Sequence, residues 1–180
     1  MKTLHLNFIN NTLIYGIIAG LLIIIIRATL YLFDIDLTNN ISFAVINFMY
    51  NIIVLSICLY RGTIVYRKKT VSGKLTYRKG LFVCVTISFV TILLVYVYDI
   101  IFYVFITPNY LANMIEPQLS AIANNHSIPY IQKMELMHKL QKFLSPFYNT
   151  SMNALMSLGI SVFLSLIVAV FTVRKRTRII

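Results

Sequence analysis

Four long apolar blocks decide what this chain can fold into. They cover residues 13–32, 41–60, 81–106 and 152–173. A helix needs about 20 predominantly apolar residues to cross a hydrocarbon core of roughly 30 Å. Inside lipid, an unpaired sheet edge or irregular backbone would leave polar groups without partners. The blocks therefore predict an all-α integral membrane protein with four transmembrane helices.

Composition supports a single transmembrane domain over residues 1–180. The hydrophobic share is 59% and the charged share 12%, whereas about a quarter of the residues of a soluble domain are charged. The blocks leave no room for a separate soluble domain. The first block is too long for the apolar core of a signal peptide, so we expect it to remain as a span.

Basic residues predict the orientation. Residues 61–79 hold seven Lys or Arg and no acid. With four spans, this segment shares a side with both termini, and that side carries twelve of the 16 basic residues. Basic segments stay on the cytoplasmic side. The pattern predicts two hairpins joined by a cytoplasmic loop over 61–79, with both termini cytoplasmic. An imbalance this large excludes the dual-topology exporters, which need nearly equal charge on both sides.

The same topology explains the net charge of +11 without a nucleic acid partner. We expect this basic face to attract anionic lipid headgroups, at about 1 kcal/mol per residue near the surface. Its residues are Arg67, Lys68, Lys69, Lys74, Arg78, Lys79, Arg174, Lys175, Arg176 and Arg178.

The segment 107–150 is predicted as an extracytoplasmic loop interrupted by four prolines. Its second half, residues 127–145, has the pattern of an amphipathic surface helix, with Ser127 as cap and Pro129 in the first turn. An apolar stripe runs along this helix, which would lie either on the membrane or across the top of the bundle. The stripe consists of Ile131, Met134, Met137, Leu140 and Leu144.

Small residues at four-residue spacing predict close helix packing. Gly16 and Gly20 form a G-x-x-x-G in the first span, and a longer ridge runs along the fourth. That ridge consists of Ser157, Ser161, Ser165 and Ala169. In the second span, Asn47 and Asn51 lie one turn apart, and their cost in lipid predicts that they face the bundle.

Arg27 and Asp99 are the charged residues deep within spans. Each costs about 2.5–3.5 kcal/mol at a helix centre. Both stand a few residues before the outer end of their span, so an ion pair between the first and third spans would offset much of that cost. The alternative is that Arg27 extends to the outer headgroups or to Asp34, while Asp99 faces a wet crevice.

Enzymatic chemistry is not expected. No carboxylate pair, nucleophile–histidine set or glycine-rich phosphate loop is present at workable spacing, so we predict no catalytic residue and no cofactor. His126 and His138 lie near methionines, but the methionines belong to the apolar stripe and no thiolate joins them, so no metal site is predicted.

The layout resembles a family of uncharacterised four-span bacterial membrane proteins, common in Bacteroidetes and classified as a domain of unknown function. The resemblance rests on Gly73, on residues 77–80 before the third span, and on residues 106–110 at its outer end, followed by Met114 and Glu116. Thr107 and Asn109 stand where that family often has Asn and Asp. The resemblance implies the four-helix fold and bacterial inner-membrane residence, and it brings no activity, catalytic residue or cofactor.

Two functions follow as hypotheses. The first is a non-enzymatic membrane protein that acts through helix–helix association with itself or a membrane partner. The second is a small transporter or channel component that uses Arg27 and Asp99. Sequence patterns leave open the biological process, any solute, the partner and the oligomeric state.

Overall fold

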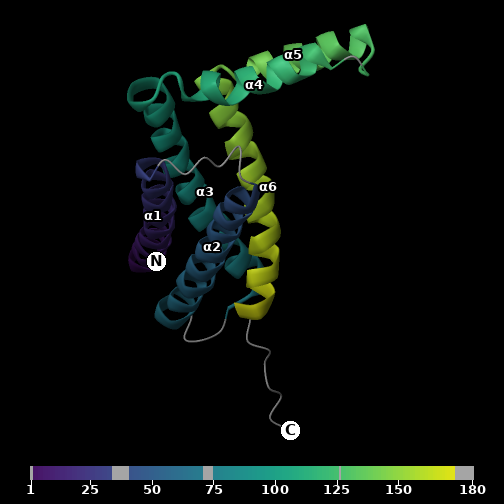
Figure 1. Ribbon diagram of the computed structural model, residues 1–180. Coiled ribbons are helices and arrows are strands. Elements are labelled where there is room, and N and C mark those ends of the chain that lie inside the picture. Colours follow the sequence, from purple (N-terminus) through teal and green to yellow (C-terminus); the bar gives the residue numbers. More distant parts are fainter. Residues whose placement is uncertain (1, 34–40, 71–74, 126, 173–180) are drawn as a thin grey trace. The chain divides into compact units, whose positions relative to one another are not determined.

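Every secondary-structure element in the described part of the chain is a helix. The computed structural model describes residues 2–33, 41–70, 75–125 and 127–172, with side chains described for 12–33, 45–69, 75–125 and 127–172. The elements run in the order α1, α2, α3, η1, α4, α5 and α6 (Figure 1). Their bounds are α1 Lys2–Leu32, α2 Ile41–Thr70, α3 Tyr77–Ile101, the π-helix η1 Phe102–Ile106, α4 Tyr110–Asn124, α5 Tyr130–Lys142 and α6 Pro146–Thr172. The predicted all-α fold is confirmed.

Four segments are long and apolar enough to cross a membrane. They are Thr12–Leu32, Val45–Lys69, Tyr77–Ile106 and Pro146–Thr172. All four predicted apolar blocks lie mostly within them. The observed helices extend beyond the blocks, because polar and basic residues continue a helix past the hydrocarbon at little cost.

The prediction of a loop over residues 61–79 is wrong for most of that segment. Helix α2 continues to Thr70, and α3 begins at Tyr77. Arg and Lys have high helix propensity, and no proline interrupts residues 61–70. Most of these basic residues therefore lie on the ends of two helices. Lys74 lies outside the described residues.

The outer segment 107–150 is also more ordered than predicted. It contains an unexpected helix, α4, with Pro117 inside it. The interior proline removes one backbone hydrogen bond, but burial of Leu111 and Ile115, each 2% exposed, favours the helix. Pro146 begins α6 instead of breaking the chain, as suits a residue whose φ is already helical and whose missing N–H is not needed there.

The amphipathic surface helix is confirmed as α5, three residues shorter at each end than predicted. Pro129 occupies the cap position with extended ψ of 144° and no side-chain cap bond. Ser127 does not cap the helix, because α5 begins three residues later, at Tyr130. Its backbone N–H donates to Asn125 Oδ1 at 2.9 Å in the preceding turn.

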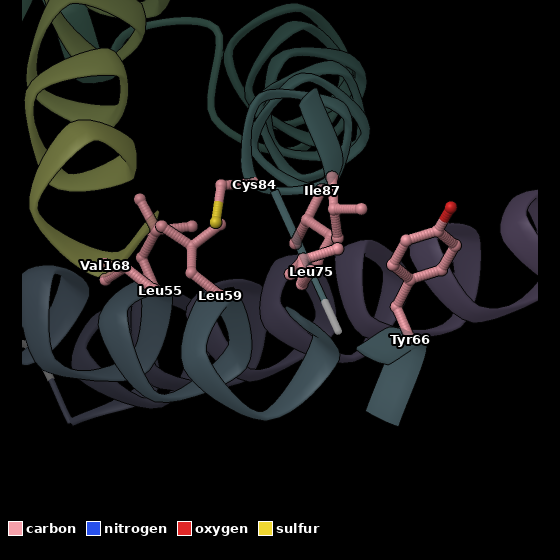
Figure 2. Packing of buried hydrophobic residues seen from close by; sticks show 8 residues of the cluster. Leu55, Leu59, Tyr66, Leu75, Cys84, Ile87 and Val168 are labelled. Atoms are coloured by element: carbon pink, nitrogen blue, oxygen red, sulfur yellow. The ribbon is translucent and has the colours of Figure 1, made fainter. Parts of the chain in front are cut away.

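The chain divides into two compact units, residues 1–95 with 157–180 and residues 96–156, which we describe separately. Helices α3 and α6 run from one unit into the other. In the first unit, helices α2, α3 and α6 together with Leu75 contribute to one buried cluster (Figure 2). Tyr15 of α1 packs against it. The cluster contains Leu55, Leu59, Tyr66, Leu75, Val83, Cys84, Ile87 and Val168.

Candidate functional site

Gly16 and Gly20 place α1 directly against α3. A Cβ added at Gly16 would lie 2.7 Å from Val90 Cβ and 3.0 Å from the Ile87 carbonyl oxygen. At Gly20 it would lie 3.1 Å from Leu94 Cβ. Such contacts exist only because glycine lacks a side chain. The G-x-x-x-G surface is therefore occupied by a helix of the same chain.

Thr91 adds a hydrogen bond at this crossing. Its hydroxyl lies 3.1 Å from the Gly16 carbonyl oxygen and 3.0 Å from that of Ile87, so one O–H is shared between two acceptors. The side chain is 2% exposed. Sequence patterns did not single out Thr91, although a hydroxyl inside a span signals an interhelical or backbone partner.

A third glycine, Gly62 on α2, meets both of these helices. A Cβ there would lie 2.6 Å from Ile87 Cδ1 and 3.2 Å from Tyr15 Cβ. Gly62 therefore marks the point where α1, α2 and α3 approach one another. Sequence reasoning missed Gly62, although the four-residue spacing between the small residues Cys58 and Gly62 is a pattern that indicates close helix packing.

A buried polar pair joins α2 to α3 nearby. Thr63 Oγ1 lies 2.7 Å from the Leu59 carbonyl oxygen and 3.1 Å from Cys84 Sγ. A hydroxyl has one hydrogen to give. Since the shorter contact to Leu59 takes it, the Cys84 thiol is the donor to Thr63. Cys58 and Cys84 are both buried and unbridged.

The predicted ridge on α6 is buried over most of its length. Ser161, Ser165 and Ala169 are at most 1% exposed, whereas Ser157 is exposed. A matching ridge on α3, which sequence patterns did not single out, consists of Gly80, Cys84 and Ser88, all buried. A Cβ on Gly80 would lie 3.7 Å from Thr172 Oγ1, so the α3 ridge begins beside the end of α6.

Several buried oxygens have no hydrogen-bond partner among the described residues. They include Oγ of Ser88 and Ser165 and Oδ1 of Asn47 and Asn51. The two asparagines are half-buried, so the predicted polar face of α2 is partly turned into the protein.

Arg67 connects the end of α2 to the end of α6. Its guanidinium donates from Nη1 to the carbonyl oxygen of Thr172 at 2.7 Å. Thr172 is the last residue of α6, where carbonyl groups lack intrahelical partners and the helix dipole favours a cation. Arg67 was predicted only as part of a basic face.

The other predicted basic residues lie near the same helix ends or outside the description. Lys68, Lys69, Arg78 and Lys79 are exposed at the end of α2 and the start of α3. Arg174, Lys175, Arg176 and Arg178 lie outside the described residues, as Lys74 does.

The two charged residues within spans differ in burial. Asp99 is 4% exposed, whereas Arg27 is half-buried, and each takes part in an interaction. Arg27 belongs to the first compact unit and Asp99 to the second. Their mutual ion pair stays a prediction.

Asp99 stands one turn before an aromatic cluster. Phe102 packs on Tyr98, Tyr103 and Tyr110, with ring centroids 5.5–5.8 Å apart. Tyr103 stacks on Tyr110 at 5.9 Å. The cluster lies where the α-helix α3 gives way to the wider π-helix η1. The backbone hydrogen bond that defines this π turn runs from the Thr107 N–H to the Phe102 carbonyl oxygen at 2.9 Å. Turns of π-helix are frequent at functional sites.

Within the described part of the chain, no three His, Cys, Asp or Glu side chains gather where they would hold a metal ion. His138 is exposed on α5, and His126 lies outside the described residues.

The four apolar helices and their packed small-residue faces define an all-helical protein of the multi-pass membrane class. Within that class, the chain belongs to the family described as protein of unknown function DUF4199, whose pattern matches residues 14–174. No curated protein and no solved structure matches the chain.

Proposed function

We propose that this chain is a non-enzymatic membrane protein that acts through helix–helix association. The associating surface is the face of α6 that the rest of the chain leaves exposed around Gly159. The small-residue faces of α1 and α3, and most of the ridge on α6, pack inside the chain. Association therefore needs a surface that the fold has left open.

Gly159 is the observation that carries this proposal. A Cβ added there would have nothing within 4 Å, unlike one at each of the other described glycines. Phe163, one turn further along α6, is 64% exposed, and Val162 beside it is 38% exposed. Glycine costs about 1 kcal/mol relative to alanine in a helix. An open glycine beside a large side chain forms a notch that a second helix can enter.

Cysteine crosslinking in native membranes tests the proposal. Both native cysteines are buried, so the unmodified chain is the background control. Gly159→Cys should crosslink to a second copy or to another membrane protein. Ile53→Cys, on an α2 position that is 55% exposed, is the matched control and should not. Equal crosslinking at both positions, or none at 159, would contradict the proposal.

A second candidate function is a small transporter or channel component that uses Arg27 and Asp99. The burial of Asp99 in a membrane span favours it, since an ionisable residue at such a position usually serves a pathway or a counter-ion. Flux in proteoliposomes that is lost in Asp99→Asn would support it. Restored folding in the double variant Arg27→Asp with Asp99→Arg, relative to either single change, would support the ion pair.

We also propose a bacterial inner-membrane location with both termini cytoplasmic. The exposed basic residues at the end of α2 and the start of α3 support this, since Lys and Arg concentrate on the cytoplasmic side. Fusion of a reporter that is active only outside the cytoplasm to the C-terminus should give no activity. The same fusion within the turn after α4 should give full activity.

A further inference from the structure

The start of α5 presents large apolar side chains that the protein does not cover. Tyr130, Ile131 and Met134 are 75%, 82% and 53% exposed, and α5 has no buried residue. Its neighbour α4 differs, because it buries Leu111 and Ile115. The hairpin of α4 and α5 thus buries apolar residues of α4, whereas it leaves those at the start of α5 exposed and covers Met137 and Leu140 only in part.

Both ends of this hairpin are tied closely to membrane spans. Three residues join the end of the third span at Ile106 to α4, and three join α5 to the start of α6. Four peptide steps reach at most about 14 Å. The α5–α6 corner is also packed, with the rings of Phe143 and Tyr148 in edge contact at 5.2 Å.

The hairpin runs crosswise to the first turns of α6. Helices α4 and α5 lie side by side, and together they cross the direction of those turns (Figure 1). Near the tip, Lys133 Nζ donates to the Ala123 carbonyl oxygen at 2.7 Å, which holds α5 on the end of α4. Since α6 crosses the bilayer, a hairpin held crosswise at its start follows the membrane plane.

Charge on α5 suits the headgroup layer. Lys142 follows Ile131 by 11 residues, which is three helical turns, so both lie on one face. Lys139 and Lys142 are exposed. Lysine can bury its methylene stem in apolar surroundings and hold its ammonium among phosphates.

We infer that α5 lies in the boundary between headgroups and hydrocarbon, with Tyr130, Ile131 and Met134 inserted into the bilayer. The lipid is the occupant of this face because the short connections at both ends of the α4–α5 hairpin, together with its direction across the first turns of α6, keep α5 at the membrane surface. The inference is independent of association through Gly159.

Tryptophan scanning tests this directly, because the chain contains no tryptophan. Ile131→Trp and Met134→Trp are made in the full chain and reconstituted in phosphatidylcholine–phosphatidylglycerol bilayers, with or without acyl chains brominated near the headgroup. Gln132→Trp, about a third of a turn round the same helix, is the matched control. Emission from positions 131 and 134 should be blue-shifted and quenched several-fold more strongly than emission from position 132.

Two results would overturn the inference. Water-like emission at positions 131 and 134, with no more quenching than at 132, would place this face in solvent. Blue-shifted emission that brominated lipid does not quench would show that protein, including a second copy, covers it.

Discussion

The hydroxyl of Thr91 on α3 reaches the carbonyl oxygen of Gly16 on α1 at 3.1 Å. A side chain at position 16 would meet Val90 and push the two helices apart, so the hydrogen bond and the glycine depend on each other. Helix contacts in lipid gain little from the hydrophobic effect, and they rely on such close packing and on hydrogen bonds between helices.

Gly16→Ala should destabilise the protein by about 1–3 kcal/mol, the usual cost of overpacking a close contact. Gly20→Ala should cost less, because its nearest neighbours are 3.1 Å from the added Cβ instead of 2.7 Å. Unfolding of the detergent-solubilised protein, followed by circular dichroism, measures the difference. Gly159→Ala is the control and should be neutral or slightly stabilising; an equal loss at 159 would contradict the explanation.

Thr91→Val should cost about 1 kcal/mol, within the range measured for hydrogen bonds between membrane helices. The substitution keeps the shape of the side chain and removes the donor to Gly16. Thr91→Ser retains the hydroxyl and should recover most of the loss in the same unfolding measurement. If serine and valine behave alike, packing and not the hydrogen bond governs this position.

Arg67→Gln should loosen the last turn of α6, with a cost of about 0.3–2 kcal/mol for a cation removed from a helix C-terminus. The local readout is faster amide hydrogen exchange over the last turn of α6. Lys68→Gln removes the same charge from an exposed neighbour, and it should leave exchange there unchanged. Similar exchange rates in both variants would show that the positive charge in general, and not the hydrogen bond to Thr172, stabilises the last turn of α6.

The pair of Glu135 and Lys139 predicts a pH effect on α5. Lys139 Nζ donates to Glu135 Oε1 at 2.6 Å. This hydrogen bond, with the lysine charge, lowers the pKa of Glu135 below its ordinary value of 4.5. A lowered folded-state pKa means that the stabilisation is present above the unfolded-state pKa and is lost as the pH falls through the folded value. Helicity of α5 measured by NMR should fall over that acidic window, and Glu135→Gln should remove the dependence.

Sequence patterns located the interiors of the spans but misplaced several ends. Twenty apolar residues suffice to identify a span. The local propensity of residues 61–70 only permits a helix, and packing such as that of Gly62, Thr63 and Tyr66 against other helices fixes it. Pro117 and Pro146 were interpreted as breaks, because the burial that supports α4 and the first-turn position of Pro146 are not visible in local pattern.

For the candidate site too, sequence patterns predicted some features and missed others. A four-residue spacing identified the packing faces of α1 and α6, and it cannot say which helix covers them. That Gly16 faces Val90, or that Arg67 reaches Thr172, depends on the relative placement of segments far apart in the sequence. The bond from the Cys84 thiol to Thr63 is of this kind, since its partners are 21 residues apart.

The crossing at Gly62 has a consequence for how this family can diverge. A Cβ there would lie 2.6 Å from Ile87 Cδ1, at the end of a flexible side chain, and 3.2 Å from Tyr15 Cβ, so two different helices would have to yield to it. Enlarging position 62 therefore favours a smaller side chain at 87 and a residue at 15 that lets α1 shift by a few tenths of an ångström. Across related sequences, these three positions should therefore vary as one correlated set, and their covariation would record the meeting point of three helices.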